Sequence, residues 1–314
     1  MDDSTPRPEP PHTPRTVAVT GASGLLGGEL VRQLARDGHR VLRLVRRAPA
    51  GPDEVRWDRE GGKVDAPALE GVDAVVHLAG ENVGARWTDE RKRRILRSRA
   101  DGTRTLAEAL AVLRVPPAVL VSASAVGIYG SRGGEVLDEG SALGVDFLAQ
   151  VCRAWEAAAQ PAADAGIRVV HPRFGVVLSA EGGALARMLP PFRLGAGGRM
   201  GNGRQWMSWV SLEDAVGAIR FFIESAAARG PVNVAAPNPV TNADFTAALG
   251  RALGRPTLLA VPAFALRTLL GEMAESTVLA SQRVSCDKLL ALGYRFRHPD
   301  LDGGLASALR SPGA

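Results

Sequence analysis

The chain has 314 residues, of which 46% are hydrophobic and 23% charged, as is typical of a globular protein large enough to bury a full core. No apolar run approaches the roughly 18 residues that a membrane-spanning helix needs, so no membrane partner is expected. The net charge of +5 is compatible with an anionic cofactor. Aromatic residues make up only 5% of the chain, and no basic stripe with interleaved aromatic residues is present, so no nucleic-acid partner is expected.

The start of the chain, residues 1–14, is polar and rich in proline, and it lacks the basic and apolar regions of a signal peptide. We therefore expect a disordered tail over these residues and a cytoplasmic protein. Cys152 and Cys286 make neither a disulfide framework nor a metal-ligand spacing. Two reduced thiols and no metal site are predicted.

Strand and helix patterns alternate from residue 15 onward. Short β-branched or apolar runs predict strands, and apolar residues at helical spacing predict helices between them. This alternation predicts an α/β fold, a Rossmann-type doubly wound parallel sheet over residues 15–177. The predicted strands cover residues 16–20, 40–45, 55–57, 74–78, 118–122 and 167–171, and the helices cover residues 24–37, 88–113 (one long helix or a broken pair) and 147–163.

After Pro172 the pattern changes to glycine-rich loops and short elements in mixed order. A helix predicted over residues 212–225 is assigned to the Rossmann domain. Segments 178–211 and 226–314 are assigned to a smaller C-terminal α+β lobe on the substrate side. No internal repeat is visible in the sequence.

Residues 20–27 read TGASGLLG and join the first predicted strand to the first helix. Gly21 permits a tight turn, Gly24 lets a pyrophosphate approach the backbone, and Gly27 lets helix and strand pack closely. The pyrophosphate would lie on free N–H groups at the positive end of the helix. The pattern therefore predicts a nicotinamide dinucleotide in contact with Gly21, Ser23, Gly24, Leu25, Leu26 and Gly27.

The end of the second predicted strand discriminates between NAD and NADP. An acidic residue there would bind the ribose 2′-hydroxyl, whereas a cation would pair with a 2′-phosphate. The sequence has Arg46 and Arg47 at this place and no carboxylate before Asp53. Arg46 is our first candidate for the phosphate and Arg47 the second, because a guanidinium grips phosphate with two hydrogen bonds. NADP(H) is the preferred cofactor, and NAD(H) stays possible.

Several short motifs beyond this loop resemble the short-chain dehydrogenase/reductase superfamily. The likeness is strongest to its extended, sugar-nucleotide epimerase-like branch, and within it to the atypical "epimerase family protein" group. It covers nearly everything between residues 15 and 309, and residues 261–305 resemble that group's C-terminal domain of unknown function. The motifs are HLAGEN at 77–82, Ser98-Arg99, SASA at 122–125, Trp155-Glu156, GGAL at 182–185 and GRQW at 203–206.

The resemblance implies further cofactor contacts. Leu78, Ala79 and Gly80 would follow the path of the ribose and pyrophosphate, and Val177 would lie near the nicotinamide amide. Arg99 would lie near the dinucleotide, at a place where the superfamily usually has asparagine.

The superfamily's catalytic tyrosine and lysine are missing from this chain. Counting back from Trp155-Glu156, Leu148 takes the tyrosine position and Cys152 the lysine position. Leu148 cannot transfer a proton, and Cys152 brings no positive charge. Ser124 is retained and would face the nicotinamide as a candidate catalytic residue, while Tyr129 is a weaker candidate acid.

The substrate side is expected in the smaller lobe, where polar donors and large flat side chains gather. Its candidate residues are Arg173, Gln205, Trp206, Ser208 and Trp209. Arg173 would suit an anionic substrate. The glycine-rich segment 195–203 is either a mobile lid or a flexible hairpin.

Two functions follow from these observations. The first is an NADP(H)-dependent oxidoreductase or epimerase-like enzyme acting on an unidentified carbonyl or sugar-type substrate, with Ser124 polarising the carbonyl oxygen. The alternative is a non-catalytic binding or regulatory protein that responds to NADPH, for which the lost tyrosine and lysine are the main support.

Overall fold

A nine-stranded sheet forms the centre of the computed structural model, which describes residues 13–58 and 61–310. Its strands run in the order β14-β9-β6-β5-β1-β2-β3-β4, with β7 paired to β9, and all neighbours are parallel except β3 and β4. The predicted tail lies outside the described residues apart from positions 13 and 14. The strands are β1 (Thr16–Thr20), β2 (Arg40–Val45), β3 (Glu54–Asp58), β4 (Lys63–Val64), β5 (Ala74–His77), β6 (Val119–Ser122), β7 (Ser124–Ala125), β9 (Arg168–Phe174) and β14 (Gly230–Val234).

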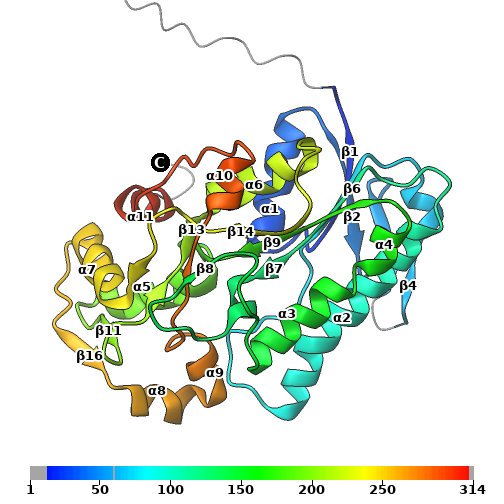
Figure 1. Ribbon diagram of the computed structural model, residues 1–314. Coiled ribbons are helices and arrows are strands. Elements are labelled where there is room, and N and C mark those ends of the chain that lie inside the picture. The colour runs from blue at the N-terminus through cyan, green and yellow to red at the C-terminus, as the bar shows by residue number, and fades with distance from the viewer. Residues whose placement is uncertain (1–12, 59–60, 311–314) are drawn as a thin grey trace, which may run out of the picture.

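Helices cover both faces of this sheet, which confirms the Rossmann-type doubly wound fold (Figure 1). Val17 and Val19 of β1 pack toward α1 (Leu25–Arg36) and α6 (Leu212–Glu224), whereas Ala18 packs toward the opposite helices. Successive side chains of a strand point to opposite faces, so a strand buried on both sides is apolar throughout. The opposite face carries α2 (Asp89–Ala111), α3 (Phe147–Ala157) and α4 (Gln160–Asp164).

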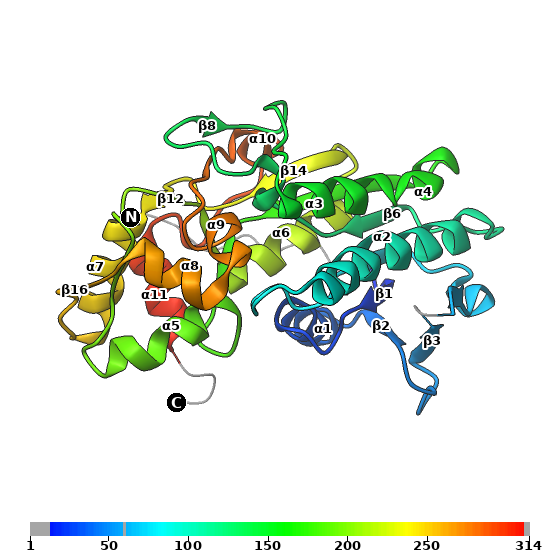
Figure 2. The same cartoon turned by 90° about the horizontal axis from the view of Figure 1, so that it is seen from below.

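The smaller lobe lies beside the carboxyl ends of the strands and has a core of its own (Figures 1 and 2). Trp209, Phe245 and Leu305 are fully or almost fully buried in that core. The elements on this side are β8 (Val136–Leu137), β10 (Val176–Leu178), α5 (Gly183–Arg193), β11 (Gly198–Met200), β12 (Trp206–Met207), β13 (Trp209–Ser211), β15 (Val240–Thr241), α7 (Asn242–Leu253), β16 (Leu259–Val261), α8 (Ala263–Leu270), α9 (Glu272–Ser276), β17 (Arg283–Val284), α10 (Asp287–Ala291) and α11 (Leu301–Leu309).

Two features differ from the sequence-based expectations. The helix predicted over residues 147–163 is two helices, α3 and α4, and Pro161, which lacks an N–H, lies in the first turn of the second one, where no intrahelical hydrogen bond is lost. Strand β14, which was assigned to the smaller lobe, pairs in parallel with β9 and forms an edge of the central sheet. By contrast, residues 88–113 form the single long helix α2.

The buried Asp214 joins the C-terminal segment to the first turn of α6. Its Oδ1 accepts hydrogen bonds from the backbone N–H of Arg297 at 2.7 Å and from the Tyr294 hydroxyl at 3.2 Å. Its Oδ2 accepts from the backbone N–H of His298 at 3.0 Å and from the Ser211 hydroxyl at 2.8 Å. A carboxylate fully removed from water is stable only because its lone pairs are satisfied in this way.

No helix in the described part of the chain is long and apolar enough to cross a membrane. Among the same residues, histidine, cysteine and carboxylate side chains form no cluster of three or more that could hold a metal ion.

We predict that Asp214→Ala lowers the free energy of unfolding by about 3 kcal/mol or more, because several buried donors lose their acceptor at once. Urea denaturation of the two proteins measures this difference. The matched control is Glu213→Ala, because Glu213 lies in the same helical turn as Asp214. Its partly exposed side chain pairs with His298, and this pair is expected to contribute less than about 1 kcal/mol. Equal losses in both variants would contradict the role of Asp214 as a joint.

Candidate functional site

The glycine loop after β1 brings three chain segments into direct contact. Gly21 has a φ of 68°, and a Cβ built on it would lie 2.9 Å from the backbone nitrogen of Ala79. A Cβ on Gly27 would lie 2.1 Å from the carbonyl oxygen of Gly21. No side chain fits at either position, so the start of α1, the end of β1 and the loop after β5 pack backbone to backbone.

The first turn of α1 is open to an anion. Gly24 is its N-cap, no side chain caps the helix, and the first turn has no acidic residue. The backbone N–H groups of this turn therefore have no intrahelical acceptor, and they carry the positive end of the helix dipole. Ser23 and Gly24 are exposed at this end. These groups fit a pyrophosphate, in keeping with the prediction for residues 21–27.

A second uncapped helix begins beside the first one. Gly182 is the N-cap of α5 and has no side-chain cap. A Cβ on Gly182 would lie 3.7 Å from Leu25 Cδ1, and one on Gly183 would lie 3.8 Å from Leu25 Cδ2. The predicted nicotinamide contact Val177 adjoins this place, since its carbonyl oxygen would lie 3.7 Å from that Gly183 Cβ. The smaller lobe thus places a second helix start against the first turn of α1.

Hydroxyl groups hold the buried His77 at the end of β5. Nδ1 lies 2.7 Å from the Thr20 hydroxyl, and Nε2 lies 2.9 Å from the Thr103 hydroxyl. The Thr20 oxygen also accepts hydrogen bonds from the N–H groups of Leu78 and Ala79, at 3.1 and 3.2 Å. Complete burial, assisted by the charge of Arg99, lowers the pKa of His77 to about 3. His77 is a neutral structural histidine that shapes the loop after β5.

The two arginines after β2 differ in their surroundings. Arg47 donates to both carboxylate oxygens of Glu54, at 2.5 and 2.7 Å, so its guanidinium is already engaged. Arg46 is exposed, and within the described residues it has no hydrogen bond or ion pair. Of the two candidates, Arg46 is therefore the one whose guanidinium is available to a 2′-phosphate.

Arg99 lies between the loop after β5 and helix α3. Its guanidinium carbon is 4.8 Å from the centre of the Trp155 ring, and it would come within 2.9 Å of a Cβ on Gly80. Nη1 also donates to the carbonyl oxygen of Glu81 at 3.0 Å. The guanidinium of Arg99 is thus held in place by an aromatic face and a backbone carbonyl.

A buried ion pair underlies the predicted catalytic residues. Arg173 donates to Oε1 and Oε2 of Glu156, at 2.8 and 2.9 Å, and the Arg173 side chain is only 4% exposed. The Ser124 hydroxyl donates to Glu156 Oε1 at 2.7 Å. Although burial opposes the charge, the hydrogen bonds and charge of Arg173 lower the pKa of Glu156. An ionised carboxylate only accepts hydrogen bonds, so the single hydroxyl hydrogen of Ser124 points to Glu156.

This geometry corrects two expectations. Ser124 cannot polarise a carbonyl oxygen while its hydrogen is shared with Glu156, and it presents oxygen lone pairs instead. Arg173 is bound to Glu156 through both ends of its guanidinium fork, so it is not a free anchor for a substrate anion.

Tyr129 is held in the same network. The tyrosine is fully buried, its hydroxyl donates to Asn233 Oδ1 at 2.7 Å, and it accepts from Arg173 Nη1 at 2.9 Å. Burial raises its pKa despite the nearby cation. The position of the missing tyrosine holds Leu148, whose Cβ would lie 3.6 Å from a Cβ on Gly127. The position of the missing lysine holds Cys152, and burial raises the pKa of its thiol to about 12. Tyr129, Leu148 and Cys152 are therefore not placed as proton donors.

The substrate-side residues fall into two groups. Trp209 is fully buried with its Nε1 bonded to the Asn238 carbonyl, and the Ser208 hydroxyl bonds the backbone of Gln282 and Val284, so both belong to the core. Gln205 and Trp206 are partly exposed. The Gln205 amide joins the carbonyls of Met200 and Val278, at 3.0 and 3.1 Å, and Trp206 stacks under the Arg283 guanidinium.

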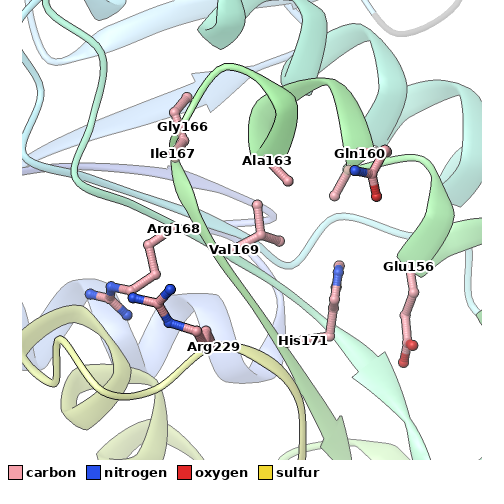
Figure 3. A pocket seen from close by; sticks show the side chains of 11 residues that line it. Glu156, Gln160, Ala163, Gly166, Ile167, Arg168, Val169, His171 and Arg229 are labelled. Atoms are coloured by element: carbon pink, nitrogen blue, oxygen red, sulfur yellow. The ribbon is translucent and has the colours of Figure 1, made fainter.

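A pocket of about 480 Å³ opens on the far side of Glu156, under α3 and α4 and over β9 (Figure 3). Figure 3 shows His171 and Gln160 on one side of it and the guanidiniums of Arg168 and Arg229 on the other. Burial lowers the pKa of His171, and Arg168 donates to the carbonyls of Phe222 and Ala228. No residue of the glycine loop lines the pocket, so it is separate from the anion site at the start of α1.

Sequence reasoning quoted Glu156, Gly182 and Gly183 as motif residues of the resemblance but assigned them no role in the site. The signal for Glu156 was a carboxylate four residues after Cys152, on the buried face of an amphipathic helix. The signal for Gly182 and Gly183 was a pair of glycines at the start of a helix, because two residues without side chains let a ligand approach the backbone there.

We predict that His77 makes the protein less stable in mild acid. Because its pKa is depressed in the folded state, the unfolded chain binds the extra proton as the pH falls below 6.5, and stability falls with it. Between pH 7 and pH 5 the loss should be about 2 kcal/mol. Urea denaturation of the wild type and His77→Gln at both pH values measures it. The variant should be less stable at pH 7, and the gap should narrow at pH 5; a constant gap would contradict this assignment.

Comparisons with known proteins agree with this geometry. Residues 17–235 match the model of the NAD dependent epimerase/dehydratase family, and residues 261–308 match a domain of unknown function (DUF1731). The epimerase family protein Mb2239 of Mycobacterium bovis is 47% identical over 298 residues, which cover 95% of this chain and 98% of that protein. The epimerase family protein YfhF of Bacillus subtilis is 39% identical, covering 93% of this chain and 97% of that protein.

A solved structure shows the same architecture. The human epimerase family protein SDR39U1 (isoform 2), crystallised with NADPH, superposes with a TM-score of 0.86 at 34% identity, and the match covers 93% of this chain and 98% of that one. The family match spans more than half of the chain, and relatives at this identity span nearly all of it. The chain belongs to the NAD dependent epimerase/dehydratase family and resembles its epimerase family proteins that carry the C-terminal domain of unknown function.

Proposed function

We propose that this protein binds NADP(H) and transfers a hydride between the nicotinamide and an unidentified carbonyl or sugar-type substrate, without the usual tyrosine and lysine. The observation that carries the proposal is the glycine loop. Gly21 and Gly27 admit no side chain, and the uncapped start of α1 leaves backbone N–H groups for a pyrophosphate. The human relative with the same fold was solved with NADPH.

The preference for NADP(H) over NAD(H) rests on Arg46. It follows β2, where the adenosine ribose of a Rossmann-bound dinucleotide lies, and its guanidinium is exposed. Arg47, in contrast, is paired with Glu54. Leu78, Ala79, Gly80, Arg99 and Val177 would complete the groove around the dinucleotide.

When bound, the nicotinamide supplies or accepts the hydride. Ser124 would touch the reacting oxygen, and its lone pairs suit a substrate hydroxyl, which is a hydrogen-bond donor. Glu156 would then accept the proton that Ser124 gives up while Ser124 takes the proton of the substrate hydroxyl. Arg173 keeps Glu156 ionised and therefore able to accept a proton, while it also makes this carboxylate a weaker base. The proposal therefore favours an alcohol as the group bound at Ser124.

A second function is favoured by a specific observation. The places of the catalytic tyrosine and lysine hold Leu148 and the buried thiol of Cys152, and Tyr129 is locked between Asn233 and Arg173. A protein with this site could bind NADPH and respond to it through a partner surface instead of turning over a substrate. A pull-down whose partners are the same with and without NADPH would exclude this function.

We predict that Arg46→Ala weakens NADPH binding by about tenfold or more and leaves NADH binding unchanged, because only NADPH carries the 2′-phosphate that a guanidinium binds by charge-assisted hydrogen bonds. Fluorescence titration with each cofactor measures the two dissociation constants. Arg47→Ala is the matched control and should change the NADPH constant less than Arg46→Ala. A loss of equal size for NADH would contradict the assignment.

We predict that the purified protein, mixed with NADP⁺ or NADPH and a panel of alcohols, aldehydes, quinones and nucleotide sugars, changes the nicotinamide absorbance with at least one compound. Ser124→Ala should lower that rate by about 100-fold, the usual contribution of a group that moves a proton in the reaction. An unchanged rate in this variant would show that Ser124 takes no part in the reaction. Tight cofactor binding without turnover of any compound would favour the regulatory function.

A further inference from the structure

We propose that Arg187 is a cofactor-binding residue whose guanidinium holds the pyrophosphate of the dinucleotide from the side of the smaller lobe. The inference rests on the proposed NADP(H) binding. It adds a residue of α5 that lies far along the sequence from the glycine loop and ten residues after Val177, the nearest position expected to bind the cofactor.

The first observation is the place of the guanidinium. A Cβ built on Gly84 would lie 2.3 Å from Nη1 of Arg187, 2.9 Å from Cζ and 3.2 Å from Nη2. The guanidinium therefore lies against Gly84, nearest through Nη1, in space that a larger residue at position 84 would fill. Gly84 belongs to the loop after β5, the loop whose first residues press against Gly21.

The second observation is the route by which Arg187 reaches this loop. Gly183 and Arg187 stand four residues apart in α5 and therefore share one face of the helix. Gly183 packs against Leu25 in the first turn of α1. Arg187 thus projects from just above the contact between the two helix starts, and its far end lies on Gly84.

Together these contacts make a closed ring around the open end of α1. The ring passes from Gly21 to Ala79, along the loop to Gly84, across the guanidinium of Arg187, and back through Gly183 to Leu25. Leu25, one member of this ring, is the first residue of α1, and the uncapped N–H groups of that turn are the groups that receive a pyrophosphate. A phosphate bound there is within the reach of the Arg187 side chain.

The third observation is the charge of Arg187. The side chain is exposed, and within the described part of the chain the salt bridges leave it without a carboxylate partner. A guanidinium placed beside two positive helix termini is repelled by them unless an anion lies between. A pyrophosphate supplies that anion, and its oxygens match the planar donor fork of arginine.

The test compares NADPH binding by the wild type, Arg187→Ala and Arg193→Ala, using fluorescence titration. Arg193 is the matched control because it is exposed in the last turn of the same helix, away from the ring. We expect Arg187→Ala to raise the NADPH dissociation constant about tenfold or more, and Arg193→Ala to change it less than about twofold. Equal effects in the two variants, or none in Arg187→Ala, would overturn the proposal.

A fragment of the cofactor locates the contact. Adenosine 2′-monophosphate keeps the 2′-phosphate and lacks the pyrophosphate, and its affinity can be measured by competition with NADPH. Arg187→Ala should leave its affinity unchanged, whereas Arg46→Ala should lower it. A loss of fragment affinity in Arg187→Ala would show that Arg187 does not act on the pyrophosphate. If the wild-type protein bound no NADPH, the proposed function itself would be overturned. If the wild type and Arg187→Ala bound NADPH equally well, only the role of Arg187 would be overturned.

Gly84→Ala gives a second variant that keeps every charge. Its methyl group would displace the guanidinium from its seat, and the φ of Gly84 is not in the left-handed region, so alanine fits the backbone. We expect the NADPH dissociation constant to rise severalfold while the melting temperature stays near that of the wild type. An unchanged constant would overturn the assignment of this seat.

Discussion

The whole site depends on one steric constraint, the absence of room for a side chain where α1 crosses the end of β1. A Cβ on Gly27 would be only 2.1 Å from the Gly21 carbonyl oxygen, and one on Gly21 would meet the backbone of Ala79. Backbone contact at this point aims the first turn of α1 at the groove with its N–H groups unpaired. The anion site, the contact with α5 and the ring closed by Arg187 all follow from that direction of the helix.

A buried ion pair stands beneath the place where the superfamily has its tyrosine and lysine. Glu156 and Arg173 neutralise each other and hold Ser124 and Tyr129 by hydrogen bonds. Removing one partner of such a pair leaves an uncompensated buried charge, so the group is expected to respond as a unit. In the proposed role of Ser124, this network leaves the lone pairs of its hydroxyl for a substrate, and these lone pairs suit an alcohol better than a carbonyl.

The smaller lobe does more than cover the end of the sheet. Asp214 joins the C-terminal segment to the first turn of α6, and α5 brings its uncapped start to Leu25. The lobe and the Rossmann domain therefore meet at the start of α1, and a dinucleotide bound there as proposed would contact both. A protein built in this way can couple cofactor binding to the position of the lobe, which either an enzyme or a cofactor-responsive regulator could use.

The sequence by itself determined the alternating elements, the glycine loop and the arginine pair after β2, because these depend on local spacing and on backbone space that only glycine leaves. Tertiary structure alone decided the partners. It showed that Arg47 pairs with Glu54 and that Arg173 faces Glu156 instead of a substrate, and it placed Arg187 on Gly84. It also placed β14 at the edge of the central sheet. Such contacts join residues far apart in the chain, and no local pattern records which side chain will meet which.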